Sequence, residues 1–266
     1  MAAALAPWRI SAFNTAKQSE NKMHDDTVAR RYGFTGGLVP GVEVMAYMMH
    51  LPVARWGRDF LERGLIEARF VKPVYDGEIA TVTGQETGNG LTLEVESRGE
   101  RCATGSASLP TRAPTIDIAA YPETPVAASR PPVGTSSFPE GQWFGTAPVN
   151  WGGARLREYL EEIRETAPLY LDHNLVHPGT LQRIMNRVLV DNVVLGPWIH
   201  VGSTMQLLAA ASGDDVLTAR ARVTANYDKK GHRFAEFDAL IVANGATPVA
   251  HCRHVAIFAP RQQAAA

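Results

Sequence analysis

The chain has 266 residues, two cysteines and a formal net charge of −1. This length suits one large domain or two of ordinary size. The nearly neutral charge provides no global field that would recruit nucleic acid or an anionic membrane surface, so neither is expected as a partner. Cys102 and Cys252 have no metal-type spacing, and we expect free, reduced thiols and no metal site.

The N-terminal segment is not typical of a targeting sequence. It has no basic stretch followed by a long apolar run, so it does not predict a cleaved secretory signal. No uninterrupted apolar run approaches the roughly 20 residues that a membrane-spanning helix needs. We therefore expect a soluble, cytoplasmic protein.

Two helices are expected in the first half. Residues 25–31 begin with two aspartates, which suit a helix N-terminus. Residues 42–56 are apolar on most sides, as is typical of a buried helix, and Gly41 stands at its start. Pro52 would kink or restart this helix, so one or two pieces are expected.

Four strands follow the second helix. Most of them alternate with a period of two, and they cover residues 65–71, 78–83, 91–96 and 101–109. Asn89-Gly90 lies between the second and the third strand. It predicts a type I′ hairpin turn, whose two central residues need positive φ.

A proline-rich stretch comes next. Residues 110–150 contain eight of the 17 prolines and show neither helical nor strand periodicity. We interpret residues 111–150 as a linker that wraps over the surface and pairs briefly near residues 116–118. The two predicted units are then residues 1–110 and residues 151–266.

The second unit repeats the order of the first. A helix is expected over residues 180–190, a hairpin turn at residues 228–231, and strands over residues 199–207, 216–223, 233–241 and 249–257. Each half is therefore one buried helix followed by an antiparallel meander. A helix that is hydrophobic on most sides must lie across a strongly curved sheet, which predicts an α+β fold.

The two halves also share sequence. Gly41 and Gly179 each follow a proline and are 138 positions apart, which indicates one structural unit used twice. Only the first copy has a polar cluster at residues 19–24. Tyr159 and Glu162 stand at the places of its asparagine and histidine. We therefore expect one chemically equipped half and one supporting half.

A buried helix wrapped by an antiparallel sheet, twice in one chain, looks like the double hotdog fold. Asn21-Lys-Met-His24, then Ala29, Tyr32-Gly-Phe34 and Gly36-Gly-Leu-Val-Pro-Gly41, resembles the hydratase motif of the MaoC-like enoyl-CoA hydratase and dehydratase family. Residues 69–77, Arg-Phe-Val-Lys-Pro-Val-Tyr-Asp-Gly, resemble a second segment of that family. The resemblance implies an α+β double hotdog that acts on an unsaturated acyl thioester.

The resemblance also implies site residues. It makes His24 the catalytic histidine and Asn21 the motif asparagine. In the family, an aspartate five residues before the histidine helps to hold and activate a water molecule. Ser19 stands at that place in this chain, and Lys22 replaces the motif's proline. Glu20 is the nearest carboxylate, so the hypothesis is that His24 and Glu20 together supply the acid and the base.

Adding water to an enoyl thioester needs a base, a proton donor and hydrogen-bond donors to the thioester oxygen. Histidine suits the first two roles because its ordinary pKa of about 6.5 lets it exchange protons near neutrality. Gly41 suits the third, as an unpaired N–H in the first turn of a helix. The structural alternatives are His24 as a loop histidine, Gly41 as a helix start shared with Gly179, and Asn21 as an Asx-turn residue.

Seven further residues are candidates for substrate binding: Ser19, Tyr32, Phe34, Gly36, Gly37, Arg69 and Lys72. Arg69 and Lys72 either contact the phosphates of coenzyme A or belong to a solvated strand face. Tyr32 has a counterpart in Tyr170, which favours a packing role. In the second half, residues 172–177 also fit the pattern D-x-N-x-x-H, either by coincidence or as a relocated site that would use Asp172, His173 and His177.

The sequence therefore predicts a hydratase or dehydratase of acyl-CoA-like thioesters. The alternatives are a hotdog acyl-CoA thioesterase and a non-catalytic protein that binds acyl groups or stabilises a partner. Hydration needs no cofactor beyond the carrier of the thioester, and the chain contains neither G-x-G-x-x-G after a strand nor a Walker-type phosphate loop. The expected partner is the thioester substrate, and a homodimer is compatible with this fold.

Overall fold

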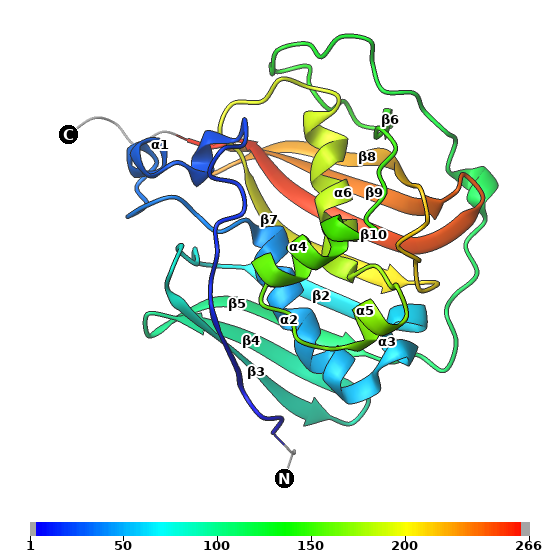
Figure 1. The fold of residues 1–266 in the computed structure, drawn as a ribbon. Coiled ribbons are helices and arrows are strands. Elements are labelled where there is room, and N and C mark those ends of the chain that lie inside the picture. Colours follow the sequence, from blue (N-terminus) through cyan, green and yellow to red (C-terminus); the bar gives the residue numbers. More distant parts are fainter. Residues whose placement is uncertain (1–3, 262–266) are drawn as a thin grey trace.

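The computed structural model describes residues 4–261, whose strands join into one sheet of ten (Figure 1). The strand order is β1-β3-β4-β5-β2-β7-β10-β9-β8-β6, so each half of the chain supplies five neighbouring strands. In the middle, β2 (Leu65–Phe70) and β7 (Ile199–Leu207) pair antiparallel, with Ala68 opposite Ser203. The order is symmetric about this pair, and the two copies of the repeat therefore lie side by side.

The first half follows the predicted order. Its other strands are β1 (Trp8–Ser11), β3 (Ile79–Thr87), β4 (Gly90–Ser97) and β5 (Glu100–Ser108). Its helices are η1 (Lys22–His24), α1 (Asp26–Arg31), α2 (Gly41–Trp56) and α3 (Arg58–Arg63). The predicted buried helix and the four strands after it are confirmed. The edge strand β1 is an addition that the sequence pattern does not predict.

The turn between β3 and β4 differs from the prediction. Thr87 pairs with Gly90, so the turn residues are Gly88 and Asn89. Neither is among the described residues with positive φ, and the predicted type I′ turn at Asn89-Gly90 is wrong. Gly90 instead belongs to β4. A Cβ there would collide with the carbonyl oxygen of Ala107 on β5, so close strand approach explains this glycine.

The second half contains the remaining elements: β6 (Trp143–Gly145), α4 (Ala154–Glu162), α5 (Leu169–Asp172), α6 (Pro178–Val190), β8 (Leu217–Lys229), β9 (His232–Ala243) and β10 (Thr247–Ala259). The turn between β8 and β9 is the predicted one. Its two residues, Lys230 and Gly231, have φ values of 54° and 79°. These values match the positive φ that tight hairpin turns need.

The helices α2 and α6 lie across the same face of the sheet and pack against each other (Figure 1). In α2, Met45, Tyr47 and Met48 have no exposed surface, and one continuous cluster of buried residues takes in both halves. Pro52 lies inside α2 without dividing it. The helix ends instead at Gly57, whose φ is 56°. The shared core holds the two halves in one fixed arrangement.

The proline-rich stretch runs along the outside of the second half (Figure 1). Residues 118–120 form a short 3-10 helix, η2 (Ile118–Ala120), so the pairing predicted near residues 116–118 is wrong. Asp117 caps this turn through its side chain, which accepts from the N–H of Ala119. Strand pairing occurs further on, where β6 joins the outer edge of β8.

Two further expectations can be compared with the structure. Cys102 and Cys252 are both free, as predicted, and both are buried. Among the helices of residues 4–261, none is long and apolar enough to cross a membrane.

Candidate functional site

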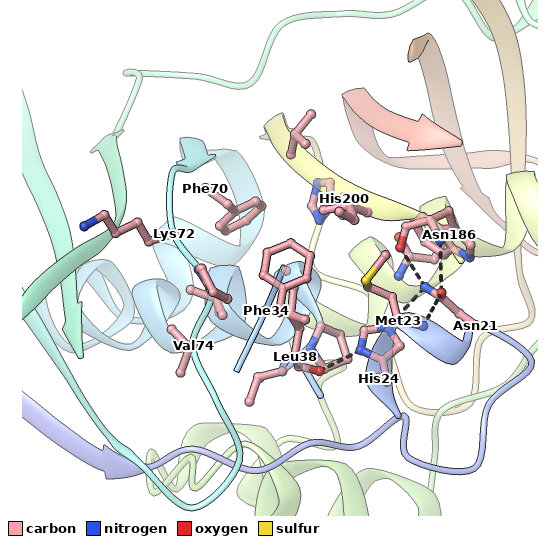
Figure 2. Close-up of a pocket in the computed structure, with 18 of the residues that line it drawn as sticks. Asn21, Met23, His24, Phe34, Leu38, Phe70, Lys72, Val74, Asn186 and His200 are labelled. Atoms are coloured by element: carbon pink, nitrogen blue, oxygen red, sulfur yellow. Dashed lines mark hydrogen bonds between the residues drawn. The ribbon is translucent and has the colours of Figure 1, made fainter. Parts of the chain in front are cut away.

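A cavity of about 200 Å³ lies where the N-terminal end of α2 meets the start of β7 (Figure 2). Most of its wall is apolar, with side chains from both halves: Met23, Phe34, Leu38, Val39, Val44, Phe70, Val71, Val74, Ile199 and Val201. The polar side chains in the wall are Asn21, His24, Lys72, Asn186, Trp198 and His200. The cavity therefore suits an apolar group that carries a polar end.

His24 ends the short helix η1 and lines the cavity. Its Nδ1 lies 2.7 Å from the carbonyl oxygen of Leu38, which can only accept, so Nδ1 carries a proton and donates it. The lone pair of the neutral imidazole is then on Nε2. Burial lowers the pKa of His24, and the Leu38 carbonyl offsets only part of this effect. His24 is therefore a neutral base near pH 7.

The amide of Asn21 holds His24 and joins the two halves. Its Oδ1 accepts from the backbone N–H groups of Met23 and Trp198, both at 3.1 Å. These two donors fix the orientation of the amide, so Nδ2 is the donor. It donates to the Trp198 carbonyl at 3.0 Å and to Nε2 of His24 at 3.2 Å. Asn21 thus makes the Asx-type bond to Met23 and also contacts the catalytic candidate.

Among residues 4–261, no carboxylate is a hydrogen-bond partner of His24. Glu20 binds Arg130 through both carboxylate oxygens, at 3.0 and 3.1 Å. This pairing lowers the pKa of Glu20. Ser19 donates to the backbone carbonyl of Asn21 at 3.3 Å. Within the described residues, Ser19 and Glu20 therefore lie near His24 without a hydrogen bond to its imidazole.

The glycines before α2 shape the loop under His24. Asp26 accepts from the N–H of Gly37 at 2.7 Å, and a Cβ at Gly37 would collide with the His24 carbonyl oxygen. Gly36 packs against the Asp26 carboxylate. Both glycines line a neighbouring polar hollow of about 600 Å³, which also borders His24. They are placed to position His24 rather than to line the apolar cavity.

Gly41 is the first residue of α2 and lines the cavity. N–H groups in the first turn have no intrahelical acceptor, and α2 has no side-chain cap. A Cβ on Gly41 would lie 3.1 Å from Nδ1 of His200 and 3.2 Å from the Phe70 ring. Glycine therefore keeps this crowded end of the helix free of a side chain.

The other predicted binding residues are dispersed. Phe34 lines the cavity, and Tyr32 packs against a small buried cluster beside it. Lys72 pairs with Glu100 at 2.6 Å, and Figure 2 shows its ammonium group pointing away from the cavity. Arg69 is exposed and lines a separate hollow on the surface. Of these four, Phe34 and Lys72 line the cavity, and only the charged end of Lys72 points away from it.

The residues of the D-x-N-x-x-H pattern in the second half do not lie together at the cavity. Asp172 and His173 are exposed, whereas His177 is fully buried. His177 caps α6, because its Nδ1 accepts from the N–H of Gly179 at 2.9 Å. Burial lowers the pKa of His177 to about 4. Within residues 4–261, no group of three or more His, Cys, Asp or Glu side chains is arranged to hold a metal ion.

Three polar wall residues come from the second half and were not predicted: Asn186, Trp198 and His200. Asn186 Oδ1, Trp198 Nε1 and His200 Nδ1 are buried and have no hydrogen-bond partner within the described chain. A β-bulge at this point means that strict period-two alternation does not predict which face of the strand His200 occupies. His200 pairs with Ala256 and Gly202 with Val255, so the register shifts between them.

No family model and no curated protein matches the sequence. A protein from Chloroflexus aurantiacus named for a MaoC dehydratase domain matches with a TM-score of 0.64 and 10% identity, over 98% of this chain and 95% of its own. A double hotdog protein from Mycobacterium tuberculosis gives a TM-score of 0.63 and 13% identity, over 95% of both chains. A protein from Lactobacillus plantarum named as an oleoyl thioesterase gives a TM-score of 0.52 and 11% identity, over 98% of both chains.

These likenesses show that the chain has the double hotdog fold, and the predicted fold class is confirmed. The solved structures that match include proteins named as dehydratases and as thioesterases. One fold hosts both reactions, so the reaction must be argued from the site.

Proposed function

We propose that the chain is a hydratase or dehydratase of α,β-unsaturated acyl thioesters and that His24 is its acid and base. The observation that carries this proposal is the Nε2 lone pair of a neutral imidazole in the wall of an apolar cavity. The MaoC-like motif around His24 and the shared fold support the same reaction class.

His24 and Asn21 are assigned to the water molecule. In hydration, water donates to Nε2 of His24 and its oxygen attacks the β-carbon of the substrate. In this structure Asn21 donates both Nδ2 protons, one to the Trp198 carbonyl and one to Nε2 of His24. The reacting water therefore has to enter between Asn21 and His24, where it donates to Nε2 and accepts the N–H that Asn21 otherwise gives to Nε2. The imidazolium then returns the proton to the α-carbon, and dehydration runs through the same steps in reverse.

Gly41 is assigned to the thioester oxygen. When water attacks the β-carbon, the electrons of the double bond move toward this oxygen and an enolate forms. A hydrogen bond from the Gly41 N–H stabilises that charge more than it stabilises the uncharged substrate. The apolar wall is assigned to the acyl chain.

The lack of a carboxylate beside His24 affects the pKa expected for this base. A carboxylate would raise the pKa of the histidine and stabilise the imidazolium, whereas burial in this site lowers the pKa. We therefore assign no chemical role to Glu20, whose carboxylate binds Arg130. His24 remains deprotonated, and able to act as a base, below its ordinary pKa.

Loss of the enoyl thioester absorbance tests the proposal, with crotonyl-CoA, longer enoyl-CoA substrates and the reverse reaction from 3-hydroxyacyl-CoA. His24→Gln should lower kcat/KM about 10²–10⁴-fold. His173→Gln, at an exposed histidine, is the matched control and should leave it unchanged. If the wild type converts none of these substrates in either direction, the proposal is wrong. Thioester binding without turnover would then favour the non-catalytic alternative.

A second candidate function, thioester hydrolysis, is favoured by Glu43. This carboxylate lies in the first turn of α2 and is 1% exposed. Its Oε1 accepts from Arg183 at 2.7 Å, while Oε2 is buried and has no partner within the described chain. Glu43 lines a hollow of about 380 Å³ that also borders His24. In this second reaction Glu43 would activate water against a thioester carbonyl, once water reaches its buried Oε2 from the hollow.

Release of free thiol from an acyl-CoA distinguishes this second reaction. A thioesterase would release thiol from saturated and unsaturated acyl-CoA, and Glu43→Gln would abolish the release. For a hydratase, the wild type releases no thiol, and Glu43→Gln retains hydration.

A further inference from the structure

His200 lies in the cavity wall and is 5% exposed. Its Nε2 lies 2.8 Å from Oγ of Ser203, and its ring meets the Phe70 ring edge-on at 4.8 Å (Figure 2). Its Nδ1 is buried and makes no hydrogen bond within residues 4–261. This atom lies against Gly41, since a Cβ added to the glycine would be 3.1 Å away. An unpaired imidazole nitrogen and a free helix amide therefore share one corner of the cavity.

Ser203 joins His200 to a second buried histidine. Its Oγ lies 3.0 Å from Nδ1 of His254, which is fully buried and stacks on His200 with ring centroids 4.1 Å apart. Nε2 of His254 has no partner in the described chain. The hydroxyl of Ser203 has no hydrogen-bond partner within residues 4–261 other than these two imidazoles, so it donates its one proton to one of them and accepts from the other. Only two arrangements of the protons are then consistent with two neutral rings.

In the first arrangement, Ser203 donates to His200, His254 donates to Ser203, and Nδ1 of His200 carries a proton. In the second, His200 donates to Ser203 and Ser203 donates to His254. The proton of His254 is then on Nε2, which has no acceptor in the core. Buried N–H groups without an acceptor are rarer than buried acceptors without a donor. The first arrangement is therefore favoured, because its unpaired N–H belongs to His200, the ring that lines the cavity. Since Nδ1 is itself buried, a ligand oxygen reaches this N–H when the wall beside Gly41 moves slightly to admit it.

We propose that His200 is a second catalytic residue, which donates its Nδ1–H together with the Gly41 N–H to the thioester oxygen. This inference rests on the proposed reaction at the same site. When water adds to the β-carbon, the π electrons move to the thioester oxygen, and both hydrogen bonds strengthen as its charge grows. The negative charge on the thioester oxygen disappears when the enolate takes the proton from His24 at its α-carbon. His200 keeps its own proton throughout, and Ser203 and His254 are positioning residues that fix its tautomer.

The surroundings keep His200 neutral. Burial lowers the pKa of His200 to about 3. Burial also holds the pKa of His254 well below its ordinary value. A ring that stays neutral across physiological pH donates a hydrogen bond without giving up its proton. Such a group stabilises an enolate at any pH at which His24 acts as a base.

Two substitutions of His200 test the inference with crotonyl-CoA. His200→Phe keeps a ring against His254 and removes the donor, so kcat should fall about 100-fold with KM changed less than about threefold. His200→Asn can place an amide N–H near the position of Nδ1 and should recover about tenfold of that loss. If the wild type is active and His200→Phe retains half of its kcat or more, this inference is wrong and the proposed function stands. An inactive wild type instead overturns the proposed function.

A second measurement needs no turnover, and its decisive result comes from the wild type. Nitrogen-15 NMR of the wild-type imidazoles reports which nitrogen of each histidine carries the proton. We expect His200 protonated at Nδ1 only, between pH 5 and pH 8. Ser203→Ala removes the fixing hydroxyl and should give a mixture of both tautomers, which Ser203→Thr should restore to one. A wild-type His200 protonated at Nε2 would overturn the inference, whatever the kinetics show.

Discussion

Gly41 and Gly179 occupy the same position in the two copies of the repeat, yet their amides differ. The N–H of Gly179 donates to Nδ1 of His177 at 2.9 Å. Gly41 has no side-chain cap beside it, and it lines the cavity. A Cβ on Gly179 would collide with the Tyr159 hydroxyl, so the corresponding space in the second half is filled. One copy therefore leaves the first turn of its helix without a side-chain cap at the cavity, and the other pairs its glycine amide with a capping histidine.

Alanine at these two glycines should separate function from stability. Gly41→Ala places a methyl group at 3.1–3.2 Å from His200 and Phe70, where the thioester would lie. We expect kcat/KM to fall about 10–100-fold with a small change in melting temperature. Gly179→Ala should instead lower the melting temperature strongly, because its methyl group has no space. Equal effects of the two variants on kcat/KM, measured on folded protein, would contradict this division of roles.

The rate should depend on the protonation of His24. Because burial lowers the pKa of His24, its base form persists below pH 6.5, and kcat/KM should fall with decreasing pH only below that value. Asn21→Asp puts a carboxylate beside Nε2 and stabilises the imidazolium, which should shift the fall upward by about one pH unit or more. Glu20→Gln is the control, since Glu20 binds Arg130. A profile altered by Glu20→Gln would restore Glu20 as a partner of His24.

Acid should destabilise the fold through its buried histidines. Burial lowers the pKa of His177 to about 4, whereas the unfolded chain binds that proton near pH 6.5. The unfolded state therefore takes up protons first, and stability is lost as the pH falls from about 6.5 to about 4. For His177 alone the loss is on the order of 3 kcal/mol.

Chemical denaturation between pH 7.5 and pH 5 measures this loss. His177→Asn keeps a side chain that caps helices and removes the titrating ring. The free energy of unfolding of this variant should therefore depend less steeply on pH than that of the wild type. Equal slopes would show that His177 does not carry the effect.

The ion pair of Arg183 and Glu43 should stabilise the interface of α2 and α6. Arg183 donates to Glu43 at 2.7 Å, and the Glu43 side chain is 1% exposed. Arg183→Gln leaves a buried carboxylate without its charged partner, which should cost about 3 kcal/mol at pH 8. The cost should be smaller at pH 5, because the carboxylate can then bind a proton. Urea denaturation at both pH values measures it.

The matched control for this pair is Arg187, whose partner Asp191 lies four residues later in the chain. That pair is more exposed, so Arg187→Gln should cost about 1 kcal/mol or less at either pH. If the two substitutions cost the same, burial of Glu43 does not decide the strength of its ion pair.

The local sequence pattern determined most of the secondary structure of this protein. The period-two strands, the helix after Pro40-Gly41 and the turn at residues 228–231 follow from neighbouring residues, because pleat, helix face and turn angles are local properties. The repeat and the MaoC-like motif led to the fold and to His24. The turn predicted at Asn89-Gly90 was wrong, because Gly90 is a glycine for another reason. A side chain there would collide with Ala107 on the neighbouring strand.

The site itself needed the tertiary structure, because its contacts join residues that are far apart in the chain. Asn21 meets Trp198 across 177 positions, and a bulge opposite β10 brings His200 to the corner beside Gly41. Glu20 is next to Asn21 in sequence, yet its carboxylate binds Arg130. The sequence determined which half carries the histidine and what fold surrounds it. Only the packing of one half against the other decided which polar atoms have partners and which face the cavity.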